Sequence, residues 1–259
     1  MAPDGMHTIN IPSLQGKVSK EEWGARVNLA CAYRLIAHYG WTHVTANHIS
    51  LRVPGEDEHF LLNPYGLLFD EVTASSLVKI DLEGERVEKS EWDINPAGFI
   101  IHSAVHSSKN NAHCVMHTHT RAGLAISCLK EGLKPIFQDA AIFHNRVSYH
   151  DWQGMSTEVE ECKDIAKNLG NNKVMILRNH GLLTCGETIG EAFILMYYLD
   201  KACKNQLDTM STGLETIVPS DNIMEYAAGQ YEDPRFRLGK HEWPALLRLL
   251  DDKKSIYKN

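Results

Sequence analysis

The sequence lacks a long apolar run, a basic cluster and any paired spacing of its cysteines, and each absence excludes a class of protein. Its longest apolar run, residues 192–199, is far shorter than the roughly 20 residues that cross a bilayer. The N-terminal stretch contains Asp4 and no apolar segment, so it does not resemble a secretory signal. The six cysteines are scattered, which predicts reduced thiols and a cytoplasmic protein.

Acidic residues outnumber basic ones by 33 to 26, which gives a formal net charge of −7. Nucleic-acid binding needs concentrated positive charge, so we expect no nucleic acid as a partner, and we expect no membrane partner either. The residue that the sequence has in excess is histidine, with 14 copies. Because histidine serves as a metal ligand and as a general acid or base, the question is which of these histidines converge.

Apolar periodicity and capping signals predict a single α/β domain. Ser19 and Glu22 form a capping box that begins a helix ending at Gly40. Strands are expected at 48–53, 60–62, 77–82, 113–119, 174–177 and 182–185, and further helices at 95–107, 120–130, 157–169 and 188–210. This order predicts one mixed sheet with helices on both faces. We divide the chain into an N-terminal arm (1–18), the domain (19–212) and a C-terminal extension (213–259).

Three histidines form the strongest candidate site. His117 and His119 close a predicted strand, where residues i and i+2 face the same side, so both imidazoles can reach one ion. His180 follows another apolar strand, in the run Arg178-Asn179-His180-Gly181. Three neutral histidines with an open fourth position form a catalytic divalent-metal pattern. The alternative is that the His-Thr-His run only makes side-chain hydrogen bonds at a polar strand end.

Other histidines have weaker signals. His102 and His106 lie four residues apart on a predicted helix, but no acidic third ligand accompanies them, so we interpret them as structural. His48 shares a strand face with Arg52, which could clamp a carboxylate, although such a face is often only solvated. The run from Tyr149 to Asp151 is rich in proton donors. We expect no site role for His38, His43, His59, His144 and His241.

Several motifs in this order resemble the class II aldolase/adducin family over roughly residues 20–212: residues 63–67 (NPYGL), 73–79 (TASSLVK), 95–99 (NPAGF), 117–120 (HTHT), 149–154 (YHDWQG) and 178–181 (RNHG). The resemblance implies a three-layer α/β/α sandwich whose central sheet is mixed and mainly antiparallel. It also implies a homotetramer with active sites between subunits. The family's L-fuculose-phosphate and L-ribulose-phosphate aldolases hold zinc or a similar ion on three histidines, and these match His117, His119 and His180.

The sequence departs from those aldolases where they hold a catalytic base and a phosphate group. Gly98 stands where the family has a glutamate, four residues before His102. Of the family's three phosphate-binding pairs, this chain keeps Asn47 but has Ala46 before it, Tyr65-Gly66 at the second pair and Pro96-Ala97 at the third. Because proline has no N–H to donate, the pattern argues against a sugar-phosphate substrate. In these respects the chain is similar to adducin head domains and to bacterial adducin-type homologues.

We therefore expect a lyase that depends on a divalent metal and breaks a C–C bond next to a carbonyl or carboxylate, by aldol cleavage or decarboxylation. The ion is expected to be zinc, with manganese, cobalt or iron as alternatives, bound to His117, His119 and His180. The expected partners are a small hydroxy-carboxylate or carbonyl substrate and further copies of the chain. The candidate catalytic residues are Tyr149, His150 and His48, and the candidate substrate-binding residues are Asn47, Arg52, Gly66 and Gly98. The alternative is a non-catalytic, adducin-like assembly domain of the cytoskeletal, actin-binding kind that keeps the metal site.

Overall fold

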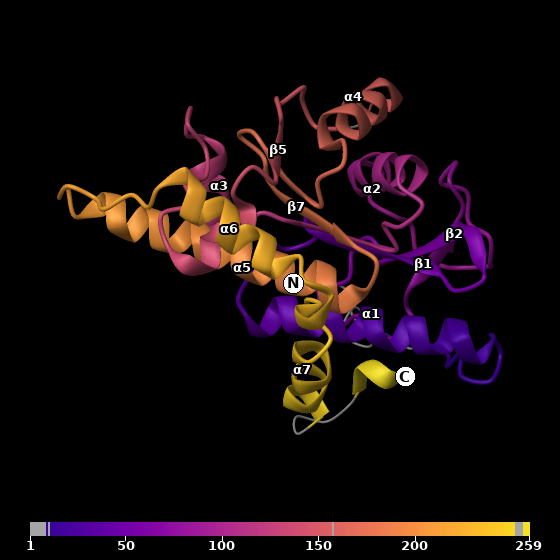
Figure 1. Cartoon of the computed structure of the whole chain (residues 1–259). Coiled ribbons are helices and arrows are strands. Elements are labelled where there is room, and N and C mark those ends of the chain that lie inside the picture. Colours follow the sequence, from indigo (N-terminus) through magenta and orange to yellow (C-terminus); the bar gives the residue numbers. More distant parts are fainter. Residues whose placement is uncertain (1–8, 10, 157, 252–255) are drawn as a thin grey trace, which may run out of the picture.

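The computed structural model describes residues 9, 11–156, 158–251 and 256–259, and its chain path is drawn in Figure 1. Its strands are β1 (His48–Val53), β2 (Glu56–Leu62), β3 (Val78–Ile80), β4 (Cys114–Thr118), β5 (Val147–His150), β6 (Val174–Leu177) and β7 (Gly181–Gly186). Its α-helices are α1 (Lys20–His38), α2 (Pro96–Ser108), α3 (Arg121–Ser127), α4 (Val159–Leu169), α5 (Ile189–Ser211), α6 (Asp221–Tyr231) and α7 (Glu242–Asp251). Short 3₁₀ turns lie at Gln138–Phe143, Pro234–Phe236 and Ile256–Lys258.

The strands form one sheet in the order β3-β2-β1-β4-β7-β6-β5. Every neighbouring pair is antiparallel except β5 and β6, which run parallel. A parallel pair needs a crossover connection, and α4 supplies it. The prediction of a mixed, mainly antiparallel sheet is confirmed. Strand β5 was not predicted, because the short polar sequence Val147-Ser148-Tyr149-His150 carries no clear apolar alternation.

Helices cover both faces of the sheet, which confirms the three-layer arrangement (Figure 1). On one face, α1, α3 and α5 pack on the sheet in one large apolar cluster that includes Leu29, Ile126 and Phe193. On the other face, Ile101 of α2 and Ile165 of α4 belong to a second, smaller cluster. The described helices include none that is long and apolar enough to span a bilayer.

Capping residues place the helix starts where the sequence indicates them. Ser19 Oγ accepts a hydrogen bond from Glu22 N at 3.0 Å and begins α1. Asn95 caps α2 in the same way, through a 3.0 Å hydrogen bond from Ala97 N, with Pro96 at the first helical position, where its missing N–H costs nothing. These caps satisfy N–H groups that have no partner inside the helix.

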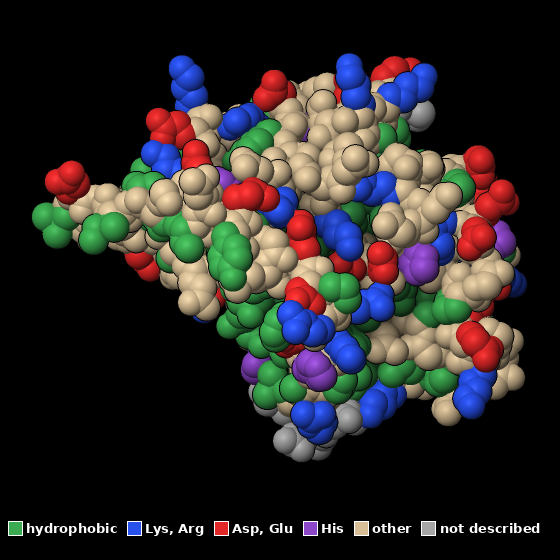
Figure 2. All heavy atoms as spheres, in the orientation of Figure 1, with side chains coloured by type: hydrophobic (Ala, Val, Ile, Leu, Met, Phe, Trp, Pro, Cys, Tyr) green, Lys and Arg blue, Asp and Glu red, His purple; other side chains and the backbone are tan. Residues whose placement is uncertain are grey.

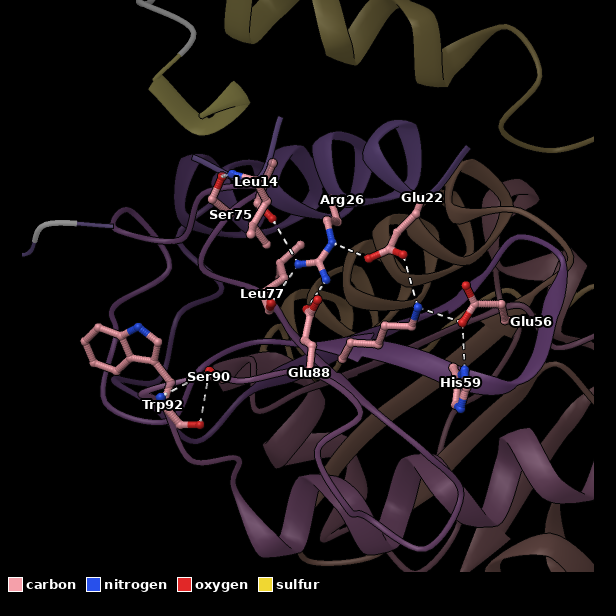
Figure 3. Close-up of polar contacts among 12 residues, drawn as sticks. Leu14, Glu22, Arg26, Glu56, His59, Ser75, Leu77, Glu88, Ser90 and Trp92 are labelled. Atoms are coloured by element: carbon pink, nitrogen blue, oxygen red, sulfur yellow. Dashed lines mark hydrogen bonds and ion pairs between the residues drawn. The ribbon is translucent and has the colours of Figure 1, made fainter. Parts of the chain in front are cut away.

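A buried ionic network ties α1 to β3 (Figure 3). Arg26 is fully buried and lies between Glu22, at 2.8 Å, and Glu88, with a further hydrogen bond to the carbonyl oxygen of Leu77. Lys79 of β3 bridges Glu22 and Glu56. A buried charge is tolerated only when it is paired, so these groups form a structural unit.

The chain ends pack onto the same body where they are described. Leu14 N donates to Ser75 Oγ, whereas half of the predicted arm (residues 1–8 and 10) lies outside the described residues. In the C-terminal extension, Trp243 Nε1 donates to Asn28 Oδ1 of α1 at 2.8 Å. Residues 252–255 of the extension also lie outside the described residues. Arg146 forms ion pairs with Glu225 of α6 and with Glu232, which directly follows that helix. Helix α6 was not predicted, because its sequence is polar and weakly amphipathic.

Candidate metal centre

The structure brings His117, His119 and His180 together at one end of the sheet. His117 is on β4, His119 follows that strand, and His180 lies in the turn between β6 and β7. Each offers a ring nitrogen within 4.8 Å of the others, and they form the one such group of metal-binding side chains in the described part of the chain. The Nε2 atoms of His117 and His119 are 2.7 Å apart.

The pairing of β4 with β7 and the turn before β7 set this convergence. Thr118 is paired with Leu182 in the sheet, and Asn179 has a φ of 57°, a left-handed conformation that asparagine tolerates. At Gly181 a Cβ atom would lie 2.6 Å from the carbonyl oxygen of Thr118 and 2.9 Å from the ring of His119. Glycine at 181 therefore allows His180 to approach the other two histidines.

The arrangement of nitrogen lone pairs fits a cation. His117 Nδ1 donates to the carbonyl oxygen of Leu182 at 2.9 Å, so the Nε2 of the neutral ring carries a lone pair. Burial lowers the pKa of His117 well below its ordinary value and those of His119 and His180 to about 4, with repulsion from the neighbouring histidines adding to the effect for His117 and His119. Neutral imidazoles with converging lone pairs are the ligands that divalent transition metals prefer.

Two residues support His119 from outside the cluster. Asn47 Oδ1 accepts a hydrogen bond from His119 N at 3.0 Å, while Asn47 Nδ2 donates to the carbonyl oxygen of Trp41. His43 Nδ1 lies 3.0 Å from His119 Nδ1, which corrects the expectation that His43 has no partner among the converging histidines. Outer partners of this kind fix the orientation of a ligating imidazole.

His48 lies beside His117 of the cluster, and Gly98 packs against the ring of His48. The ring of His48 is tilted by 32° to that of His117, with 4.8 Å between the ring centroids. A Cβ atom built on Gly98 would lie 3.0 Å from Cδ2 of His48 and 3.4 Å from its Nε2. Burial and the nearby histidines lower the pKa of His48 to about 3. Two sequence candidates from distant segments therefore meet at the site.

His48 is also the first member of a buried chain of hydrogen bonds. His48 Nδ1 lies 2.8 Å from His102 Nε2, and His102 Nδ1 lies 2.5 Å from Ser50 Oγ. Ser50 Oγ lies 2.6 Å from His106 Nε2, and His106 Nδ1 lies 2.9 Å from the carbonyl oxygen of Ala112. Both ring nitrogens of His102 and of His106 are occupied, which leaves none for a second ion.

Tyr149 and His150 are adjacent in β5 but serve opposite faces of the sheet. His150 is buried, with Nε2 3.3 Å from Glu161 Oε1 and Nδ1 accepting from Asn168 Nδ2 at 2.9 Å. Tyr149 accepts a hydrogen bond from Leu133 N, and the Arg178 guanidinium lies over its ring at 4.5 Å. Both ring nitrogens of His150 are thus engaged, whereas the hydroxyl of Tyr149 keeps its own proton to donate.

Arg52 and Gly66 do not contact the cluster among the described interactions. Arg52 lies four residues along β1 from His48, roughly 13 Å at the rise of a strand. Its guanidinium donates to the carbonyl oxygens of Asp57 and His106. Gly66 has a φ of 103° and open space around it, so it forms a turn that glycine favours.

The fold and the site together define an α/β sandwich with a three-histidine centre at the end of its sheet. The chain belongs to the family described as the class II aldolase and adducin N-terminal domain, whose sequence pattern matches residues 27–207.

The relatives of this chain carry two kinds of name, aldolase class 2 protein and adducin. A Caulobacter vibrioides protein with a provisional aldolase class 2 name is 44% identical over 252 residues, which cover 95% of this chain and 96% of that protein. Alpha-adducin of Rattus norvegicus is 40% identical over 246 residues, which cover 88% of this chain but 33% of the adducin.

Solved structures agree with the fold over nearly the whole chain. An aldolase II superfamily protein of Pseudomonas syringae has a TM-score of 0.90 at 42% identity, with 96% of this chain and 100% of that chain covered. L-fuculose 1-phosphate aldolase of Glaciozyma antarctica has a TM-score of 0.79 at 27% identity, with 95% and 96% covered.

Proposed function

We propose that this protein is a lyase that depends on a divalent metal and breaks a C–C bond next to a carbonyl or carboxylate, by aldol cleavage or decarboxylation. The observation that carries the proposal is the convergence of His117, His119 and His180 within 4.8 Å. These histidines would hold a divalent ion, which would supply Lewis-acid stabilisation of negative charge on substrate oxygens. The all-nitrogen ligand set favours zinc, with manganese, cobalt or iron as alternatives.

Two backbone N–H groups at positions that match the phosphate-binding pairs of sugar-phosphate aldolases have other partners here. Ala97 N donates to Asn95 Oδ1, and Pro96 before it has no N–H. Tyr65 N donates to the carbonyl oxygen of Asp93 at 2.8 Å. An anion needs unoccupied N–H groups or positive side chains, so we propose a substrate without a phosphate group, a hydroxy-carboxylate or a small carbonyl compound.

Proton transfer falls to different residues from those of the sugar-phosphate aldolases. Gly98 has no side chain that could remove a proton, and His48 occupies the adjacent space. Decarboxylation requires a proton donor only after the bond breaks, and the hydroxyl of Tyr149 is one candidate for that role. The absence of a carboxylate at position 98 therefore favours decarboxylation, with His48 as the group that contacts the reacting part of the substrate.

A substrate screen tests the proposal directly. Zinc-loaded and manganese-loaded protein is incubated with hydroxy-carboxylates, aromatic carboxylates and aldol products, and released CO₂ and new carbonyl groups are measured. We expect turnover that is lost in His180→Ala and unchanged in His241→Ala, an exposed histidine. Turnover that survives in His180→Ala contradicts the proposal.

The second candidate function is an adducin-like assembly domain, and one observation favours it. The end of α5 and the segment after it expose large apolar side chains, namely Met210, Leu214, Ile217 and Val218. Figure 2 shows apolar side chains gathered at this protruding end of the molecule. Exposed apolar clusters mark contact surfaces, so we propose that this end contacts another copy of the chain in a homotetramer. An inactive protein that still assembles supports this candidate.

A further inference from the structure

The hydrogen-bond chain from His48 to Ala112 has one direction. The carbonyl oxygen of Ala112 can only accept, so His106 Nδ1 must carry a proton. In a neutral ring, His106 Nε2 then has none and accepts the single hydroxyl proton of Ser50. Ser50 Oγ has no further proton to give, so it must accept from Nδ1 of His102.

The same logic continues to the metal centre. His102, with its proton on Nδ1, has a bare Nε2, and the group 2.8 Å away from it is His48 Nδ1. His48 must therefore donate through Nδ1, and a neutral His48 leaves its Nε2 without a proton. That nitrogen makes no hydrogen bond within the described residues and is not among the polar atoms sealed away from solvent without a partner.

Burial excludes water from the hydrogen-bond chain and keeps its imidazoles neutral. His48, Ser50, His102 and His106 are each at most 2% exposed, and the ring of Phe60 packs on His106 with 4.8 Å between centroids. Burial lowers the pKa of His106 to about 3 and that of His102 well below its ordinary value. Every ring nitrogen of the chain except His48 Nε2 has a hydrogen-bond partner within the protein.

We infer that Ala112, His106, Ser50 and His102 act as positioning residues that lock His48 as its Nδ1–H tautomer, so that its Nε2 meets the substrate as a hydrogen-bond acceptor. The ligand must then offer a proton donor at this point, as a hydroxyl group does and as an ether oxygen, a carboxylate oxygen or a phosphate oxygen does not. The assignment of this ligand class rests on the proposed function, whereas the tautomer lock does not.

Nitrogen NMR of the protein with ¹⁵N-labelled histidine rings tests the lock without any measurement of activity. Assigned signals should place the proton on Nδ1 in His48, His102 and His106, although a free neutral histidine side chain prefers the proton on Nε2. A proton on Nε2 of His48 in the wild-type protein overturns the inference. This measurement needs no variant, so it stands even where a substitution in the chain destabilises the fold.

Two serine variants then test whether the hydrogen-bond chain fixes the tautomer of His48. Ser50→Ala removes the oxygen that joins His102 to His106, and we expect His48 to populate both tautomers. Ser103→Ala is the matched control. Ser103 is also buried and lies on α2, but its hydroxyl donates to the carbonyl oxygen of Ile100, which is not part of the hydrogen-bond chain. An unchanged His48 tautomer in Ser50→Ala, or the same change in Ser103→Ala, contradicts the inference.

A pair of ligands tests whether His48 Nε2 accepts a hydrogen bond from a bound ligand. Glycolate and methoxyacetate differ only in the hydroxyl proton and a methyl group, and their affinities for zinc-loaded protein are compared by calorimetry. We expect at least a ten-fold preference for glycolate in the wild type and a clearly smaller one in Ser50→Ala, where the shape of the site is unchanged. Equal preference in the two proteins, or no preference in the wild type, overturns the ligand class. Correct tautomers in a protein without lyase activity would count against the proposed function alone.

Discussion

Gly98 packs against the imidazole of His48 so closely that a single added carbon would contact the ring at 3.0 Å. His48 cannot easily move away, because its Nδ1 is bonded to His102 and its ring lies beside that of His117. Position 98, which carries a glutamate in the sugar-phosphate aldolases, is here part of the packing around a histidine. Substitutions at this position therefore report on the site.

Gly98→Ala should destabilise the protein by about 1–3 kcal/mol, the usual cost of an overpacked interior, and should lower any activity that depends on His48. The matched control is Gly24→Ala on α1, where an added Cβ meets nothing within 4 Å. In that open position alanine should be neutral or stabilise by up to about 1 kcal/mol. Urea unfolding of both variants checks this, and equal stability of the two would contradict the packing.

Gly98→Glu introduces a carboxylate next to His48, whose ring lies beside that of His117, one of the three proposed metal ligands. We expect a changed metal affinity or weak proton exchange next to a carbonyl group, measured by metal titration and by deuterium uptake into a ketone. The melting temperature is recorded in parallel to separate this effect from lost stability. A folded variant with wild-type metal affinity and no exchange would show that position 98 does not face the site.

Stability should fall as the pH drops below about 6.5. The pKa of His106 is lowered to about 3 in the folded protein, so between these values the unfolded chain binds a proton that the native chain does not. Each such histidine removes up to about 1.4 kcal/mol of unfolding free energy per pH unit. Urea unfolding at pH 7, 6 and 5 with a chelator present measures the slope.

His106→Gln should flatten this pH dependence, because glutamine does not titrate and can still accept from Ser50. His241→Gln, at an exposed position, should leave the slope unchanged. A wild-type stability that stays constant from pH 7 to pH 5 would be inconsistent with neutral, buried histidines.

Sugar phosphates should be poor substrates. We expect a kcat/KM for L-fuculose 1-phosphate and L-ribulose 5-phosphate well below about 10⁴ M⁻¹s⁻¹, the lower end of ordinary enzyme values. The physical reason is that the N–H groups of Ala97 and Tyr65 are already bonded within the chain. Efficient turnover of either compound, in a coupled assay with metal-loaded protein, would refute the assignment of a phosphate-free substrate.

The protein should sediment as a tetramer. Ile217, which is 91% exposed, lies in the apolar cluster at the end of α5, so Ile217→Asp should shift the distribution towards smaller species. Val87→Asp, a similar change at an exposed position on β3's side of the molecule, should not. A stable monomer of the wild type at micromolar concentration, measured by analytical ultracentrifugation, would contradict the assembly.

Local patterns in the sequence predicted most of the fold and the core of the site. Ser19 and Asn95 indicate the starts of their helices, because each caps its helix through a hydrogen bond to a residue within three positions. The i, i+2 spacing of His117 and His119 places them on the same face of a strand. These signals are local, so they can be recognised in the sequence without tertiary information. The position of His180 was predicted from its strand context together with the resemblance to the family.

The parts that were missed depend on contacts between distant segments. His43 meets His119 across 76 positions of sequence, and nothing near His43 indicates this contact. Ser50 joins His102 to His106 only because β1 packs under α2, so the chain of hydrogen bonds could not be read from the sequence. Strand β5 and helix α6 lack strong periodicity and owe their structure to tertiary packing.

The most direct test of the account is the metal content of the purified protein and of three variants, His117→Ala, His119→Ala and His180→Ala. Each histidine is expected to supply one ligand bond, so the wild type should hold about one divalent ion per chain and every variant should lose it. Elemental analysis by mass spectrometry, with His241→Ala as the control, makes the measurement. Wild-type metal content in His180→Ala would contradict the three-histidine centre on which the proposed function rests.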